Sequence, residues 1–387
     1  MKKIISILFI LMFLFSCESK ENKKNNKETI RRAKLVFTGD IMTHPKVVEA
    51  FEGNDILIDL KDYFQGDIVF ANLEFVVNTN KPPMPYPEFN GSKEYLEYFF
   101  NYFNTFSIAN NHAYDQGAKA EAETVSILHQ NNILTLGGST NSPYISPIIT
   151  NINGIPIFIS AYTMLDNGLS HKTNKDGHFY FMNFYPKKDD LIEKVKSDMS
   201  LATNNEIKII SLHFGYEYTI APEDTTIETA RALIENGVDI IIGHHPHVPR
   251  PAEVYNGTNN SGIIIYSLGN FIANHKGRYP YLDIGTILSL EIDENREISF
   301  SYVPTYYAFF RDNGFEFVMK PIKENPSINM PTLSSNYVYS AYDTNAIKAG
   351  YELINSFYSP LTNENVKDIF VLDKNIENNI MAKNWFL

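Results

Sequence analysis

Short apolar runs alternate with amphipathic stretches from residue 34 onward. The apolar runs are typical of buried strands and fall at 34–39, 67–71, 105–109, 132–138, 155–162, 207–214, 238–243 and 262–271. The stretches at 47–64, 118–130, 187–203 and 225–236 have the periodicity of helices that bury one face. Strands that alternate with helices of this length predict an α/β fold in which part of the sheet is parallel.

The alternation fades beyond about residue 305, where Tyr, Asn and Pro dominate. We therefore expect a main domain over 33–305 and a less regular C-terminal accessory region over 306–387. This region is expected to pack on the main domain and to hold one or two helices near 343–357. The proline-rich segment 78–92 is expected to be a rim loop of the main domain.

The N-terminus has the pattern of an export signal. Lys2 and Lys3 precede an apolar run over 4–15, which is too short to span a bilayer. The run ends in LFSC, which resembles a lipobox, and Cys17 is the only cysteine of the chain. We expect 1–17 to be a lipoprotein signal peptide with lipidation at Cys17, and the Lys/Asn/Glu-rich residues 18–32 to be a flexible tether. The expected location is the cell envelope, lipid-anchored and extracytoplasmic; a signal anchor with an incidental cysteine is the alternative.

Composition and charge narrow the range of partners. The chain has 387 residues, 44% hydrophobic and 20% charged, as in ordinary globular proteins. Its net charge of −12 argues against nucleic acid or an anionic membrane surface as a main partner. An anionic substrate would need a local cationic centre, such as a bound metal ion.

Polar side chains cluster directly after the predicted strands. In open α/β sheets the carboxyl ends of the strands carry the ligand site, so these clusters are expected to meet. Carboxylates, carboxamides and imidazoles without thiolates suit Mn, Fe or Zn. Each cluster alone also fits an ordinary role, because an Asp after a strand is usually a helix N-cap and Asn-Asn-His is compatible with a turn. The clusters are Asp40; Asn72 and Glu74; Asn110, Asn111, His112 and Asp115; His213 and Glu217; His244, His245 and His247; and Asn270.

In sequence order, these segments resemble the motifs of the CapA family, the poly-γ-glutamate capsule-synthesis branch of the calcineurin-like metallophosphoesterases. The resemblance covers roughly 34–305 and implies a four-layer α/β/β/α sandwich of metallophosphoesterase type with a metal site at the strand ends. The motifs are GDIMTH (39–44), DIVFANLE (67–74), ANNHAYDQG (109–117), HFGYEY (213–218), GHHPHV (243–248), followed by Pro251 and Glu253, and YSLGNF (266–271).

The resemblance also implies roles for individual residues. It makes His112 a phosphate-stabilising group or general acid, and it places His244 and Glu217 along the site. Of the three clustered histidines, we favour His245 and His247 as ligands, because residues i and i+2 of an extended segment point the same way. One or two divalent ions are both open alternatives. The implied metal ligands are Asp40, Glu74, Asn111, His213, His245 and His247.

Some residues depart from the motifs of the superfamily or of the CapA branch, and the loss of one ligand weakens one metal position. Met42 stands where a typical metallophosphoesterase has the His of Asp-x-His, and His44 substitutes for it only if the loop bends. Glu74 stands where an Asp is usual. Arg250 stands where the CapA branch often has Gln.

The leading interpretation is an envelope-tethered, metal-dependent hydrolase that acts in synthesis or export of poly-γ-glutamate or a related anionic polymer. Its expected partners are the polymer or a phosphoester substrate and capsule-synthesis membrane proteins. Phosphoester hydrolysis is favoured, and attack on an amide is also open. The alternative is a non-catalytic accessory that binds a polyanion during export. A transporter's substrate-binding lipoprotein is disfavoured, because six successive polar strand ends exceed what ligand capture requires.

Overall fold

The structure is a computed structural model of the chain. It describes residues 30–51, 55–140, 142, 145–169, 182–203, 205–275, 279–311, 315–327, 330–331, 339 and 341–361. The expected signal peptide, Cys17 and most of the tether lie outside these residues. The chain divides into residues 1–30 and 31–387, and only the second unit is considered below. Within the described ranges, no helix combines the length and apolar character needed to cross a bilayer.

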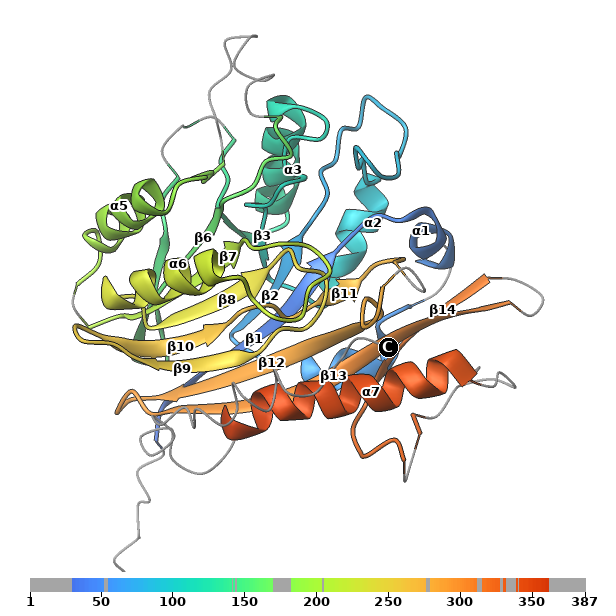
Figure 1. Ribbon diagram of the computed structural model, residues 1–387. Helices are drawn as coiled ribbons and strands as arrows, with labels where there is room; N and C mark the ends of the chain where they lie inside the picture. Colours follow the sequence, from blue (N-terminus) through green and yellow to red (C-terminus); the bar gives the residue numbers. More distant parts are fainter. Residues whose placement is uncertain are drawn as a thin grey trace, which may run out of the picture. The chain divides into compact units, whose positions relative to one another are not determined.

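The larger of two β-sheets has eight strands in the order β14-β13-β12-β1-β2-β3-β4, with β11 beside the end of β1 (Figure 1). Strands β1 to β4 and β11 are parallel, whereas β12, β13 and β14 are antiparallel. The strands are β1 (Arg32–Ile41), β2 (Ile68–Leu73), β3 (Thr105–Ser107), β4 (Leu134–Leu136), β11 (Asn270–Ile272), β12 (Ile284–Asp293), β13 (Ile298–Arg311) and β14 (Phe315–Pro321).

The second sheet has six strands in the order β5-β6-β7-β8-β10-β9. Its four inner strands are parallel, as expected from their continuous apolar sequences, and its two edge strands are antiparallel. The strands are β5 (Ile148–Ile152), β6 (Ile155–Thr163), β7 (Ile207–His213), β8 (Ile240–His244), β9 (Ala252–Asn256) and β10 (Ser261–Ile265).

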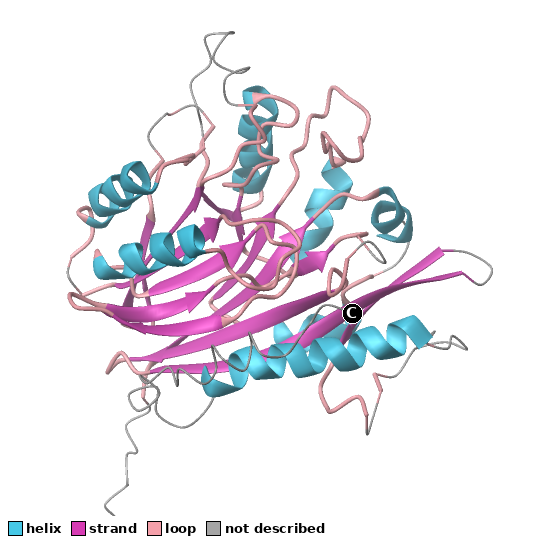
Figure 2. Ribbon diagram, viewed as in Figure 1, coloured by secondary structure: helices cyan, strands magenta, loops and turns pink. Residues whose placement is uncertain are grey.

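The sheets pack face to face, and helices cover their outer faces (Figure 2). On β7, Ile207 and Ile209 point to the other sheet, while Ile210 and Leu212 contact helices, as the two-residue period of a strand requires. The larger sheet is covered by α1 (Pro45–Phe51), η1 (Ile58–Tyr63), α2 (Lys93–Tyr98), η2 (Phe99–Asn101) and α3 (Ala118–Gln130); the smaller by α5 (Lys188–Met199) and α6 (Asp224–Glu235). This arrangement confirms the α/β/β/α sandwich.

The region after residue 305 differs from the expected accessory region. Strand β13 runs through this position and β14 follows it, so the expected boundary lies inside the sheet. The composition was misleading because buried tyrosines, such as Tyr306 and Tyr307, occupy strand positions. Helix α7 (Ala341–Tyr358) confirms a helix near 343–357, and η3 (Ser359–Leu361) follows it. Residues Ile347, Leu353, Ile354, Phe357 and Tyr358 join α7 to the core between the sheets.

Two further expectations are corrected. The single strand expected over 262–271 is two strands in different sheets, because the chain leaves β10 at Ile265 and enters β11 at Asn270, past Gly269 with φ +74°. The stretch expected to be helical over 47–64 holds two short pieces, α1 and η1, rather than one helix. The crossing at Gly269 matters for function because it places Asn270 next to β1.

Candidate metal centre

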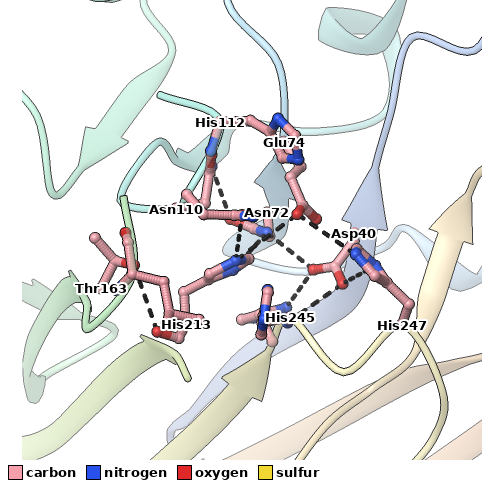
Figure 3. A network of polar contacts seen from close by, with 12 residues as sticks. Asp40, Asn72, Glu74, Asn110, His112, Thr163, His213, His245 and His247 are labelled. Carbon is pink, nitrogen blue, oxygen red and sulfur yellow. Dashed lines mark hydrogen bonds and ion pairs between the residues drawn. The ribbon is translucent and has the colours of Figure 1, made fainter. Parts of the chain in front are cut away.

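The polar strand ends of both sheets meet at one place (Figure 3). Asp40 lies near the end of β1, and Glu74 follows β2. His213 and His244 end β7 and β8, and the loop after β8 carries the other two histidines. The structure thus brings together side chains separated by more than 200 positions. Asp40, Glu74, Asn111, His112, His213, His244, His245 and His247 are buried, whereas the side chain of Glu217 is 38% exposed.

Asp40 is held from both sides by neighbouring strands. Its partners in register are Asn72 of β2 and Asn270 of β11. The Asn72 amide donates to Asp40 Oδ1 at 2.8 Å, and Asp40 Oδ2 lies 3.2 Å from His247 Nδ1. Burial alone would raise the pKa of Asp40, but the hydrogen bonds and charges of His244 and His247 outweigh it and hold this pKa well below its usual value. Asp40 is therefore an ionised carboxylate.

Glu74 is a buried carboxyl group, and both of its oxygens lack a hydrogen-bond partner among the described residues. Its Oε1 lies 3.7 Å from His213 Nε2 and 3.7 Å from His247 Nε2. Burial and the nearby charges of Asp40 and Glu217 raise the pKa of Glu74 well above its usual value. An unpartnered buried carboxylate is costly, and a cation between these groups would remove the cost. The residues present therefore fit a divalent ion.

The ligand-type atoms form three overlapping groups, each within 4.8 Å. Burial and neighbouring histidines lower the pKa values of His213 and His245 well below the usual value, so both imidazoles are neutral and retain a lone pair. Asn111 joins through its Oδ1, which lies 2.8 Å from His213 Nε2. The groups are Glu74, His213 and His245; Glu217, His245 and His247; and Asp40, Glu74 and His247.

His244 belongs to none of these groups among the described residues. Its ring packs against Phe70 with centroids 5.7 Å apart, and its Nδ1 lies 3.2 Å from Asp40 Oδ1. This position beside the carboxylate suits a residue that lines the site.

The loop GHHPHV is bent, so the reason given for choosing its second and third histidines is wrong. The φ angles of His245 and His247 are +96° and +60°, which is left-handed rather than extended backbone. Non-glycine residues held there cost on the order of 1–3 kcal/mol each and cluster at functional sites. The backbone N–H of Tyr218 donates to the Pro246 carbonyl at 2.9 Å and ties the bend to the Glu217 loop.

His112 forms a pair with a buried acid. Its Nδ1 lies 2.7 Å from Asp115 Oδ2, which also accepts from the Phe89 backbone at 2.7 Å. The His112 ring packs on Phe89 with centroids 4.7 Å apart. A carboxylate on Nδ1 orients the ring, so Nε2 is the nitrogen able to give or take a proton.

Three asparagines of the expected polar clusters position the site, although no individual role was assigned to them from the sequence. Asn110 donates to the Leu73 carbonyl at 2.8 Å and accepts from the His112 backbone. Asn270 Oδ1 lies 3.0 Å from His247 Nδ1, which leaves Nε2 of that ring for a cation. Asn72 donates to Asp40 as above. In the sequence, the signal for such positioning residues was an asparagine at a strand end beside an acidic residue. Met42, by contrast, is buried among the helices of the outer face.

Arg250 secures the loop that carries Glu217. Its fully buried guanidinium donates to the carbonyls of Thr219 at 2.8 Å and Tyr216 at 2.9 Å. It also pairs with Glu223 at 2.8 Å. One side chain from the segment after β8 thus holds Tyr216, Thr219 and Glu223 in place.

Comparison with known proteins assigns the family. The model of the family described as "Bacterial capsule synthesis protein PGA_cap" matches residues 34–275, more than half of the chain. The chain belongs to the CapA family. All the site residues named above lie within the matched range. This CapA-family chain is 30% identical over 280 residues to the "PGA biosynthesis protein CapA" of Bacillus subtilis (strain 168), covering 69% of this chain and 70% of that protein.

Two further relatives match shorter stretches. The "Capsule biosynthesis protein CapA" of Bacillus anthracis is 30% identical over 172 residues, which cover 44% of this CapA-family chain and 40% of that protein. A "Probable polyglutamine synthesis accessory protein" of Mycobacterium tuberculosis is 27% identical over 179 residues, 44% of this chain and 45% of the relative. The chain thus matches less than half the length of these two proteins.

Proposed function

We propose that this protein is an envelope-tethered, metal-dependent hydrolase that acts in the synthesis or export of poly-γ-glutamate or a related anionic polymer. The pathway is supported by the names of its relatives, which refer to PGA and capsule biosynthesis. The hydrolase character rests on one observation above all. Glu74 places two unpartnered carboxylate oxygens in a buried site beside neutral imidazoles, and this is an environment that a cation would complete.

The ion would be held by Asp40, Glu74, His213, His245 and His247, with Asn111 and Glu217 as further oxygen donors. Mixed oxygen and imidazole donors suit Mn, Fe or Zn, and the shared members of the three groups allow one ion or two adjacent ions. When bound, the ion would polarise a phosphoryl or carbonyl oxygen and make water a better nucleophile.

The chain's own residues supply the remaining chemistry. His112, oriented by Asp115, would give a proton to the leaving group through Nε2. His244 would hold Asp40 in its ionised form, and Glu217 at the half-exposed rim would meet the incoming substrate. Phosphoester hydrolysis is the reaction this set fits best, and an amide of the polymer is the second candidate substrate.

A non-catalytic polyanion-binding accessory is the alternative function. The specific observation in its favour is that Met42 is buried in the outer core, so a ligand position used by the wider superfamily is not supplied there. A site with one weakened metal position would still attract anions. Lipid anchoring through Cys17 and contact with capsule-synthesis membrane proteins belong to both versions of the proposal.

Four variants test the metal centre. His245→Ala, His247→Ala and Asp40→Asn should each weaken Mn²⁺ binding by on the order of 10–100-fold or more, judged from the effect of losing even a supporting partner. His244→Ala, the matched control from the adjoining end of β8, should retain the metal and impair turnover of bis-p-nitrophenyl phosphate. Metal content and phosphodiesterase activity are measured on each purified protein.

The outcomes separate the two functions. Metal retention by all four variants would show that these residues do not form a metal centre. Metal binding by the wild type without turnover of phosphodiester or γ-glutamyl amide substrates would favour the accessory function. Loss of metal from His244→Ala with retention by His245→Ala would exchange the roles of these two histidines.

A further inference from the structure

His44 lies in the wall of the site although it belongs to none of the candidate ligand groups. It follows β1 by three residues, is 7% exposed, and meets Phe89 edge-on with ring centroids 5.3 Å apart. Phe89 in turn packs on His112. On its other side His44 contacts the ring of His275 at 4.8 Å, and His275 packs on His247 at 5.2 Å. His44 therefore stands between the proposed proton donor and a proposed metal ligand.

The hydrogen bond of His44 fixes which ring nitrogen carries the proton. The backbone N–H of Asn274 donates to His44 Nδ1 at 3.1 Å, so Nδ1 supplies a lone pair and the proton of the neutral ring lies on Nε2. Burial and the charges of His247 and His112 lower the pKa of His44 to about 3, so the ring stays neutral near physiological pH. Its Nε2–H is a fixed donor.

His112 has the opposite arrangement. Its Nδ1 faces the Asp115 carboxylate, which accepts a hydrogen bond from it, so Nε2 is the nitrogen left to give or take a proton. The two histidines flank Phe89 and divide two tasks: His112 moves a proton, whereas His44 donates a hydrogen bond without releasing one. A neutral donor of this kind matches an oxygen that bears negative charge throughout binding.

We propose that His44 is a substrate-binding residue whose Nε2–H donates a hydrogen bond to an oxyanion oxygen of the substrate, either a phosphoryl oxygen or a carboxylate of the polymer. This inference rests on the proposed function, because it takes the substrate to lie at the metal centre. The inference assigns a function to the row of rings formed by His112, Phe89, His44 and His275, which metal ligation alone does not explain.

Two amide variants separate binding from structure. The Asn amide reaches the place of a histidine Nδ1, so His44→Asn can keep the acceptor for Asn274 and loses the distant donor. The Gln amide reaches the place of Nε2, so His44→Gln keeps a donor there. The full chain is loaded with Mn²⁺, and calorimetry measures binding of inorganic phosphate and, in a second arm, glutarate. The arm that responds identifies the oxyanion.

We expect His44→Asn to weaken binding of one anion by on the order of 10-fold or more, which is the worth of one hydrogen bond to a charged group. His44→Gln should stay within about 3-fold of wild type, with equal Mn²⁺ content in all three proteins. Wild-type affinity in His44→Asn, or equal losses in both variants, would overturn the inference. So would a wild type that holds Mn²⁺ and binds neither anion, and that result would leave the metal centre intact.

A measurement on the wild type covers the case in which a variant fails to fold. In the Zn²⁺-loaded protein, the ¹⁵N resonance of His44 Nε2 should shift when phosphate or glutarate is added, while its Nδ1 stays nearly constant. An unchanged Nε2 resonance at saturating anion would overturn the inference. Failure of the wild type to bind any metal would overturn the proposed function, and His44 would then be judged by the same titration of the metal-free chain.

Discussion

Replacing Arg250 with methionine should destabilise the fold and release the loop that carries Glu217. The guanidinium is fully buried, and three of its contacts reach that loop: the carbonyls of Tyr216 and Thr219 and, just beyond them, the carboxylate of Glu223. Methionine replaces the stem of the arginine side chain, but it ends two atoms short of the terminal nitrogens and donates no hydrogen bond. The substitution therefore removes the charge and keeps only the packing of the stem.

The expected loss of unfolding free energy is about 3–5 kcal/mol. Removing one partner of a buried ion pair costs about 3–5 kcal/mol, because the other charge remains buried and unpaired. The lower part of this range applies because the Glu223 side chain is 18% exposed, so water can reach it in the variant. Each loop carbonyl left without a donor adds about 1 kcal/mol at most, since the loop can open toward solvent.

Urea unfolding of the wild type and two variants measures this loss. The control is Arg31→Met, which makes the same change of side chain in a pair with Glu294 whose members are 60% and 33% exposed. An exposed pair is worth about 0–1 kcal/mol, so the control should stay close to the wild type. A loss below about 1 kcal/mol in Arg250→Met, or equal losses in both variants, would refute the role assigned to this arginine.

Three other predictions concern different parts of the chain. Burial raises the pKa of Glu121 well above its usual value of 4.5, so the folded chain keeps a proton that the unfolded chain releases. Glu121→Gln should therefore become more stable than the wild type as pH rises above about 4.5 and should match it below that pH. Thermal unfolding at several pH values measures this, and a stability difference that does not change with pH would contradict it. Tyr358→Phe removes a buried hydroxyl that donates to the carbonyls of Ser267 at 3.1 Å and Arg250 at 3.3 Å. The substitution should lower the free energy of unfolding by about 1–2 kcal/mol without changing the metal content. A loss of metal would show that α7 shapes the site. Cys17→Ser should leave an unprocessed, unlipidated precursor in membrane fractions. Release of a mature, unlipidated protein from the wild type would refute the lipid anchor.

The sequence was sufficient for the parts of the fold that are buried on both faces. The inner strands of the smaller sheet, such as Ile240–Ile242 in β8, appear as continuous apolar runs and are easily recognised. The antiparallel strands β12, β13 and β14 were missed because none of them has a long continuous apolar run: polar residues interrupt β12 and β13, and Glu316 and Lys320 interrupt β14. The division of 262–271 between two sheets depends on which strands pair in space, and local sequence carries little of that information.

The site was predictable in its residue types and less so in its geometry. Strand-end carboxylates and histidines indicated a metal centre because they follow six predicted strands, although each cluster alone fits an ordinary role. The left-handed backbone at His245 and His247 could not be read from the sequence, since neither residue favours it. The roles of Asn270 and Arg250 arise from segments distant in sequence, and the same holds for the contact between His44 and His275.

Asp40 and Glu74 extend from one sheet, and His213, His245 and His247 extend from the other. An ion coordinated by residues of both sheets would cross-link the sheets and resist sliding of one over the other. Pulling the sheets apart would break coordination bonds as well as apolar contacts, so slow opening would be coupled to metal release. Amide protons of β2 and β8 should then exchange more slowly by a similar factor on metal loading. Protection confined to one sheet would mean that the two layers open independently.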